Sequence, residues 1–165
     1  MNLHPRIQTI APKKLIGNQV TMSFADNKTR ELWQGFMPHR NKIINKLNTD
    51  LICMQVYDDN LSFNNFTPNT TFQKWAAAEV ADITDIPPGM QSFTLPGGTY
   101  AVFDYKGAAS AFAPTFRCIF YEWLPQSGYE LDSRPHFEIL GAKYKNEDPE
   151  SEEEIWVPLK AKPSD

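Results

Sequence analysis

The chain has 165 residues, of which 41% are hydrophobic and 13% aromatic, enough to bury the core of one globular domain. Its 16 basic and 20 acidic residues give a net charge of -4 without a basic stripe, which argues against direct nucleic-acid binding. No apolar run is long enough for a signal peptide or a membrane span, so we expect a cytoplasmic protein that does not contact a membrane. Cys53 and Cys118 are expected to be buried thiols rather than a disulfide.

The first half of the chain is expected to run strand, helix, strand, strand. Alternating apolar residues predict the strands, and apolar residues at three- and four-residue spacings predict the helix. Asp26 and Asn27 are suitable N-caps for this helix, and Pro38 should kink it. Phe63 and Phe66 are expected to anchor the loop that follows the strand at 51–57. The elements expected in chain order are strands at 6–10 and 15–24, a helix at 27–47, and strands at 51–57 and 72–80.

The second half is expected to repeat this order after a linker at residues 82–90. Pro114 suits only the first turn of its helix, whereas Pro125 and Gly128 should end that helix. The expected elements are a strand at 99–105, a helix at 110–124, and strands at 137–140 and 154–159.

The repeated order predicts a single α+β domain made of two similar halves, roughly residues 1–82 and 91–165. Two such strand-helix-strand-strand units would join their antiparallel sheets about a pseudo-twofold axis. Helices would cover one side of the sheet, and a groove suited to a small molecule would open on the other.

Several stretches of residues 97–159 closely resemble the GyrI-like domain, namely GGTYAVFDYKG, FYEWLPQSGYELDSRPHFEILG and SEEEIWVPLK. ELWQGFMPHRNKI and FQKWAAAEV resemble parts of its first half. This is the effector-binding domain of AraC-type and MerR-type bacterial transcription regulators, and it also occurs free-standing. The resemblance implies two tandem units of the SHS2 type around a cleft that binds hydrophobic or cationic small molecules. Because the chain has no room for a DNA-binding domain, we expect the free-standing form.

Strand parity selects two carboxylates for the cleft. In the last strand the aliphatic side chains should face the helices, which leaves Glu154 and Trp156 facing the cleft. The same argument places Glu138 and His136 in the cleft, and the resemblance implies pocket glutamates at Glu138 and Glu154. A carboxylate beside aromatic rings would attract an organic cation, and desolvation would raise its pKa. The alternative is that each glutamate is an ordinary surface group, Glu154 being the last residue of the acidic run 147–154.

Aromatic residues are expected to supply the walls. Trp75, like Trp156, alternates with aliphatic residues in its strand, and Tyr105 is a further wall candidate. Trp33 lies on an apolar helix stripe that favours core packing, but the resemblance places its helix at the cleft. Tyr121 could reach the cleft edge and donate a hydrogen bond to a carboxylate. The predicted ligand-binding residues are Glu154, Glu138, Trp156, Trp75, Tyr105, Trp33 and Tyr121.

Three functions follow from this site. The first is binding of a hydrophobic or cationic small molecule. The second, implied by free-standing relatives that hydrolyse cyclopropane-containing compounds, is hydrolysis with Glu154 and Tyr121 as an acid–base pair. The third is a protein-interaction role, with gyrase or a separate regulator as the partner. No cofactor is called for, and the histidines lack the spacing of metal ligands, so no metal site is expected.

Overall fold

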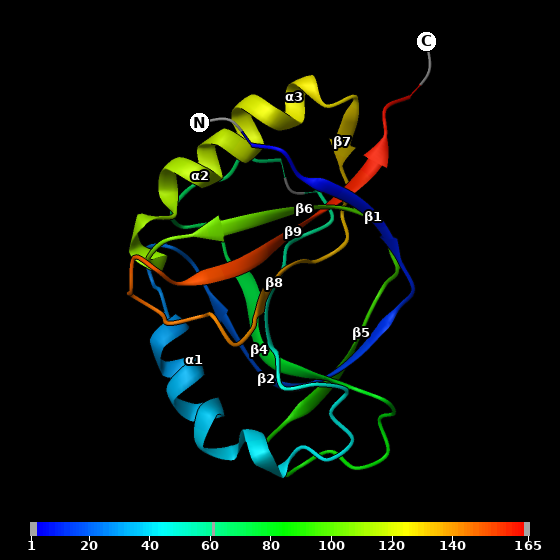
Figure 1. Ribbon diagram of the computed structural model, residues 1–165, viewed down its shortest axis with the longest axis vertical. Helices are drawn as coiled ribbons and strands as arrows, with labels where there is room; N and C mark the ends of the chain where they lie inside the picture. Colours follow the sequence, from blue (N-terminus) through cyan, green and yellow to red (C-terminus); the bar gives the residue numbers. More distant parts are fainter. Residues whose placement is uncertain (1–2, 61, 164–165) are drawn as a thin grey trace.

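The computed structural model describes residues 3–60 and 62–163, and within them nine strands form one antiparallel sheet. Its order is β1-β6-β9-β8-β3-β4-β2-β5, with β7 paired to β9 (Figure 1). The α+β class with an antiparallel sheet is therefore confirmed. The strands are β1 (Arg6–Ile10), β2 (Lys13–Met22), β3 (Leu51–Val56), β4 (Phe72–Val80), β5 (Gln91–Leu95), β6 (Gly98–Lys106), β7 (Tyr129–Leu131), β8 (His136–Leu140) and β9 (Glu152–Ala161).

The first helix is shorter than its apolar stripe predicts. α1 (Thr29–Phe36) continues as a 3-10 helix (Met37–Lys42), and the chain turns extended at Ile43. Pro38 lies at the start of the 3-10 helix, where its missing N–H interrupts the α-helical hydrogen bonds. The predicted continuation to residue 47 is therefore wrong, although the kink was expected.

The second helical region is continuous but changes its winding. A 3-10 turn (Ala109–Ala111) leads into α2 (Ala113–Arg117), a π-helical turn (Cys118–Trp123) and α3 (Leu124–Gln126). Pro114 lies in the first turn of α2, as expected. Pro125 does not end the helix as predicted, because the π-helical turn directly before it accommodates the missing N–H. The helix ends at Gln126, and Gly128 in the turn that follows has a φ of +82°, which a side chain would resist.

Two short links force the sheet to curl. β1 pairs with β6 at one end of the sheet and β5 pairs with β2 at the other, yet β1 runs into β2 through residues 11–12. Likewise β5 runs into β6 through residues 96–97. The two ends of the sheet must therefore approach each other, and β1 and β5 lie along the same side of the molecule in Figure 1. The links touch at Gly97, where an added Cβ would lie 2.5 Å from the carbonyl oxygen of Ile10.

The inner face of the curled sheet is a closed apolar core. Trp156 stacks on Phe137 with ring centroids 5.1 Å apart, and Tyr100 packs edge-on against both. The buried residues of this core are Leu15, Ile52, Met54, Trp75, Ala77, Leu95, Tyr100, Val102, Phe137 and Trp156. Because side chains fill this face, the groove that the sequence predicted on the side away from the helices is absent from the described residues.

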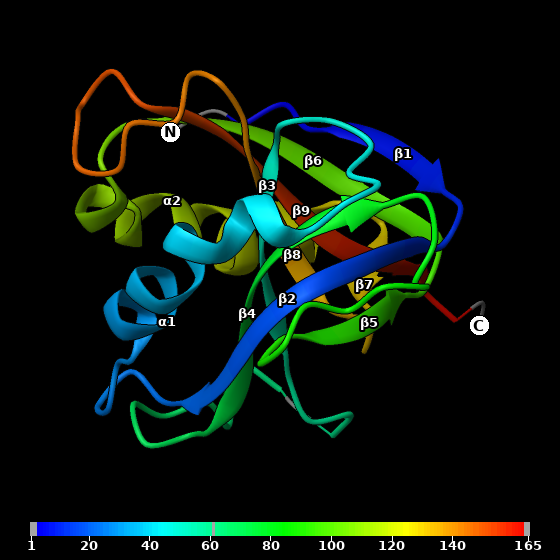
Figure 2. The ribbon, with the colours of Figure 1, turned by 90° about the horizontal axis from the view of Figure 1, so that it is seen from below.

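Both helical regions lie on the outer face, where Figure 2 shows α1 and α2 side by side beyond the strands. α1 covers β2 and β4, and α2 with its continuation covers β6 and β9. The sets β2-α1-β3-β4 and β6-α2-β8-β9 place their strands in matching order, β2-β4-β3 and β6-β9-β8. The exact division into halves stays a prediction; residues 82–90 contain neither helix nor strand.

Candidate ligand-binding site

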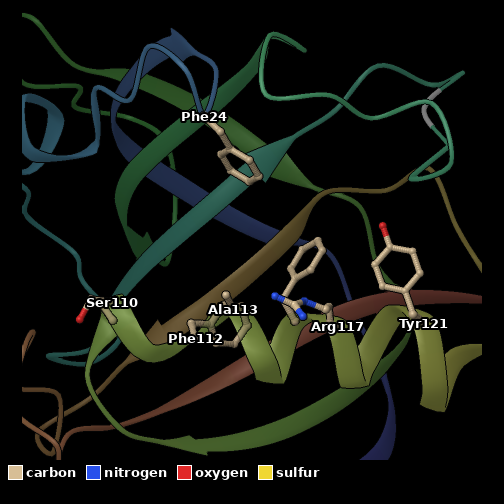
Figure 3. A pocket seen from close by; sticks show the side chains of 8 residues that line it. Phe24, Ser110, Phe112, Ala113, Arg117 and Tyr121 are labelled. Atoms are coloured by element: carbon tan, nitrogen blue, oxygen red, sulfur yellow. The ribbon is translucent and has the colours of Figure 1, made fainter.

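A cleft opens on the helix side of the sheet, above its central strands. Its mouth, of about 530 Å³, lies between Phe24, in the segment joining β2 to α1, and the helix α2 (Figure 3). Its inner end, of about 150 Å³, reaches the central strands β3, β4, β8 and β9. Phe24, Phe112 and Phe116 line both parts, which therefore form one continuous cleft.

The walls of the cleft are aromatic. Phe24 packs edge-on against Phe72 at 5.8 Å, and Phe116 lies 4.6 Å from Phe120 on the facing wall, each distance joining ring centroids. Phe63, from the loop between β3 and β4, closes against the same wall at 4.7 Å from Phe120. Phe63 and Phe66 thus hold this loop against the fold, as predicted. Aromatic walls of this kind favour flat or cationic ligands.

The floor carries a buried carboxylate that is only half satisfied. Glu138 on β8 pairs with Cys53 on one side and with Ile155 on the other, so its side chain points to the helix side. Nε2 of Gln55 donates to Oε1 of Glu138 at 3.4 Å. The second oxygen, Oε2, is buried without a hydrogen-bond partner among the described residues. An unsatisfied buried oxygen is costly, and a ligand that donates to it would recover that cost.

A second carboxylate, Glu153, faces the same side from the start of β9. It pairs with Tyr105, whose ring belongs to the core under α2. Burial, and then the charge of Glu138, raise the pKa of Glu153 to about 7 against the opposing effect of Lys74. Burial also raises the pKa of Glu138, against the effects of Lys74 and Gln55. Glu153 therefore changes its charge near neutral pH.

The remaining polar groups of the floor are neutral, apart from Lys74. Burial lowers the pKa of His136 to about 3, so its imidazole is uncharged at pH 7. Its ring packs edge-on against Tyr57 at 5.0 Å between centroids. Burial and then Glu138 raise the pKa of Tyr57, and burial and then Glu153 raise that of Tyr144 to about 12.

Glu154, the main predicted charge, lies on the opposite face of the sheet. It pairs across the strands with Ile139, which packs on the inner core. Nη2 of Arg6 donates to Oε2 of Glu154 at 2.9 Å, and Nε1 of Trp156 donates to Oε1 at 3.2 Å. The parity argument correctly placed Glu154 away from the helices. The expected placement in the cleft is wrong, because the cleft is on the helix side.

The tryptophans divide between the inner core and the cleft. The ring of Trp75 is buried in the inner core, 5.4 Å from Phe93, and does not line the cleft. Trp156 borders the inner end of the cleft, but its ring is stacked in the inner core. Trp33 packs against Phe36, and its side chain hydrogen-bonds the thiol of Cys53 beside the floor.

The two predicted tyrosines occupy different positions. Tyr105 packs beneath the aromatic wall of the cleft. Its hydroxyl donates to the carbonyl of Ala108 at 2.6 Å, and its ring packs on Phe112. Tyr121 is 53% exposed at the mouth (Figure 3). The sheet separates Tyr121 from Glu154, so the acid–base pair proposed from the sequence is not formed.

Sequence reasoning missed Glu153, Lys74 and the aromatic wall of α2. Glu153 shares the parity of Ile155, and that parity was assigned to the helix-covered core. The signal was present in the alternation, but the proximity of Glu153 to Glu138 and Lys74 is set by tertiary packing. Lys74 shares parity with Ala76 on β4. It was missed because the sequence argument assigned the opposite face of this strand, that of Trp75, to the cleft.

No three histidine, cysteine or acidic side chains within residues 3–60 and 62–163 are grouped so as to hold a metal ion. None of the helices described has both the length and the apolar character needed to cross a membrane.

The sequence matches the family described as GyrI-like small molecule binding domain over residues 3–160, and the chain therefore belongs to that family. The transcriptional regulator BrlR of Pseudomonas aeruginosa is 28% identical to it over 162 residues. That alignment covers 96% of this chain but 56% of the regulator, so the chain spans little more than half of this relative.

Solved structures share the fold. SAV2435 bound to tetraphenylphosphonium superimposes with a TM-score of 0.66 at 17% identity, covering 95% of this chain and 94% of that one. The C-terminal domain of EcmrR gives a TM-score of 0.68 at 15% identity, covering 98% of this chain and all of that one. The protein is thus a small-molecule-binding domain related to the effector-binding domains of bacterial regulators.

Proposed function

We propose that the domain binds an aromatic small molecule with a positive charge in the cleft between Phe24 and α2. Glu138 and Glu153 are the charge partners in this proposal. The observation that carries it is the buried Oε2 of Glu138, which lacks a partner in the described residues and faces an aromatic cavity. A carboxylate in such surroundings attracts an organic cation through its charge, and the ring faces add to that attraction.

No observation supports hydrolysis or a protein-interaction role as strongly as the observation above supports ligand binding. Hydrolysis by Glu154 and Tyr121 would need the two side chains to meet, and they lie on opposite faces of the sheet. A role through a protein partner, whether gyrase or a regulator, stays a prediction from the resemblance.

The test is a calorimetric titration of the protein with tetraphenylphosphonium, the cation named in the structure of SAV2435. Glu138→Gln keeps the shape and removes the charge, and we expect it to weaken binding about tenfold, which corresponds to ~1.4 kcal/mol. Glu154→Gln is the matched control, because it removes the same charge from the other face of the sheet; it should leave the affinity unchanged. Equal affinities of wild type and Glu138→Gln would contradict the proposal.

A further inference from the structure

The floor of the cleft contains a basic side chain that the binding of a cation does not explain. Lys74, on β4, lines the inner end of the cleft together with Gln55 and Glu138. It shares the helix-side parity of Ala76, whereas its neighbour Trp75 is buried in the inner core. A lysine beside a proposed cation site works against that ligand, since like charges repel most strongly where water is excluded.

Lys74 is not neutralised by direct contact. Its side chain is half-buried, and within residues 3–60 and 62–163 its ammonium takes part in none of the ion pairs. Its charge nevertheless reaches both carboxylates, because it lowers the pKa of Glu138 and that of Glu153. A partly desolvated ammonium without a contact partner is costly in the empty cleft. An acceptor supplied by the ligand would relieve that cost.

The spacing of the charges also restricts the ligand. Lys74 pairs with Gln55, and Gln55 pairs with His136, so Lys74 and the strand of Glu138 are separated by β3. Adjacent strands lie about 4.8 Å apart, so the backbone positions of Lys74 and Glu138 are about 10 Å apart or more. Between them the amide of Gln55 hydrogen-bonds Glu138. The floor therefore presents a positive group from β4 and a negative group from β8, with β3 between the two strands and aromatic walls above.

We propose that Lys74 determines the specificity of the cleft by selecting amphipathic aromatic zwitterions over lipophilic cations that lack an acceptor. The positive group of the ligand lies at Glu138 and Glu153, and its anionic group lies at Lys74. This inference rests on the proposed function, because it names the charge pattern of the ligand that the same cleft binds.

The test uses two probes that share one bulky cation. Butyltriphenylphosphonium has no acceptor, and (4-carboxybutyl)triphenylphosphonium carries a carboxylate at the end of the chain. The measured quantity is the ratio of their affinities by calorimetry at low ionic strength. We expect Lys74→Met to lower the ratio of zwitterion to cation affinity about tenfold, by weakening the binding of the carboxylate probe and tightening that of butyltriphenylphosphonium.

Two further variants separate charge from packing. Lys74→Arg keeps the charge and should keep the affinity ratio. Lys74→Gln replaces the charged side chain by a neutral polar one and should lower the ratio as Lys74→Met does. A ratio that Lys74→Met and Lys74→Gln leave unchanged would overturn the role of Lys74. So would a ratio that falls equally in Lys74→Arg.

The outcomes also separate this inference from the proposed function. If both probes bind and Glu138→Gln weakens them while the Lys74 variants leave the ratio unchanged, Lys74 has no role but the cleft still binds cations. If neither probe binds the wild-type protein, both the proposed function and the role of Lys74 are overturned.

Discussion

Glu153 and Glu154 are neighbours on β9, and their side chains project from opposite faces of the sheet. Glu153 shares the face of Tyr105 and is surrounded by the charges of Glu138 and Lys74. Glu154 is bound by Arg6 on the other face, where its side chain is 36% exposed. One residue of register thus separates a group on the helix side of the sheet from a group of the opposite surface.

The two glutamates should respond differently to the same substitution. Glu153→Gln removes a carboxylate whose charge acts on Glu138 in the floor of the cleft, and it should weaken tetraphenylphosphonium binding several-fold. Glu154→Gln breaks an exposed ion pair, so it should lower the free energy of unfolding by less than ~1 kcal/mol and leave binding unchanged. Calorimetric titration and urea unfolding measure the two effects. Weaker binding in Glu154→Gln than in Glu153→Gln would contradict this assignment.

Binding of a permanent cation should strengthen with pH. Because the pKa of Glu153 is raised to about 7, the carboxyl is mostly protonated at pH 6 and mostly ionised at pH 8. If only the ionised form attracts the cation, the affinity for tetraphenylphosphonium, which does not titrate, should rise about tenfold over this interval. Titrations at several pH values give the profile. Glu153→Gln should flatten it, and a wild-type profile that is already flat would exclude Glu153 as a charge partner.

Buried His136 should make the protein sensitive to acid. Its pKa is lowered to about 3 in the folded state, so below the unfolded value of about 6.5 the unfolded chain binds the additional proton. The stability contributed by neutral His136 is full above pH 6.5 and is lost as pH falls toward 3, by up to ~1.4 kcal/mol per pH unit.

Urea unfolding of wild type and His136→Gln between pH 7 and pH 5 measures this contribution. The free energy of unfolding of wild type should fall more steeply than that of the variant. Parallel curves would show that His136 does not titrate in this way, whatever the absolute stability of the variant.

A methyl group at Gly97 should destabilise the fold. The added Cβ would lie 2.5 Å from the carbonyl oxygen of Ile10 and 2.9 Å from the nitrogen of Pro12, and the backbone would have to move. We expect Gly97→Ala to lower the free energy of unfolding by ~2 kcal/mol or more. Gly35→Ala is the control: an added Cβ on α1 would meet no atom within 4 Å apart from its chain neighbours and its own helix backbone, so it should stabilise by ~0.5–1 kcal/mol. Similar effects of both substitutions would contradict the close contact of the two links.

Local patterns predicted the elements well where a single rule applied. The strand at 72–80 has the expected limits, because Phe72, Trp75 and Val80 fit a pleated surface that is buried on both sides. Arg134, two residues before β8, donates to Asp132 at 2.7 Å and to the backbone carbonyls of Thr99 on β6 and Leu159 on β9. The short strand β7 and the edge strand β5 were missed, because neither has a long alternating run.

The site was harder to predict, because its location depends on the curl of the whole sheet. Parity correctly separated Glu154 from the aliphatic residues of β9, but parity cannot tell which face of a sheet will be closed. That is decided by the links around Gly97, which bring together strands that are far apart in the sequence. The parity argument placed Glu138 in the cleft, but for the wrong reason, because it put the helices on the face of the strand opposite to Glu138.

The two short links at residues 11–12 and 96–97 affect how the chain folds. β1 completes the edge beside β6, and the hydroxyls of Thr9 and Thr99 meet across that pair although 90 positions separate them. During synthesis β1 must therefore wait, unpaired, until β6 has been made. Pairings of such long range slow folding, since a large loop must close before any contact rewards it. A fragment that ends before β6 would lack the partner of β1, so the part of the chain before β6 is not expected to complete its sheet alone.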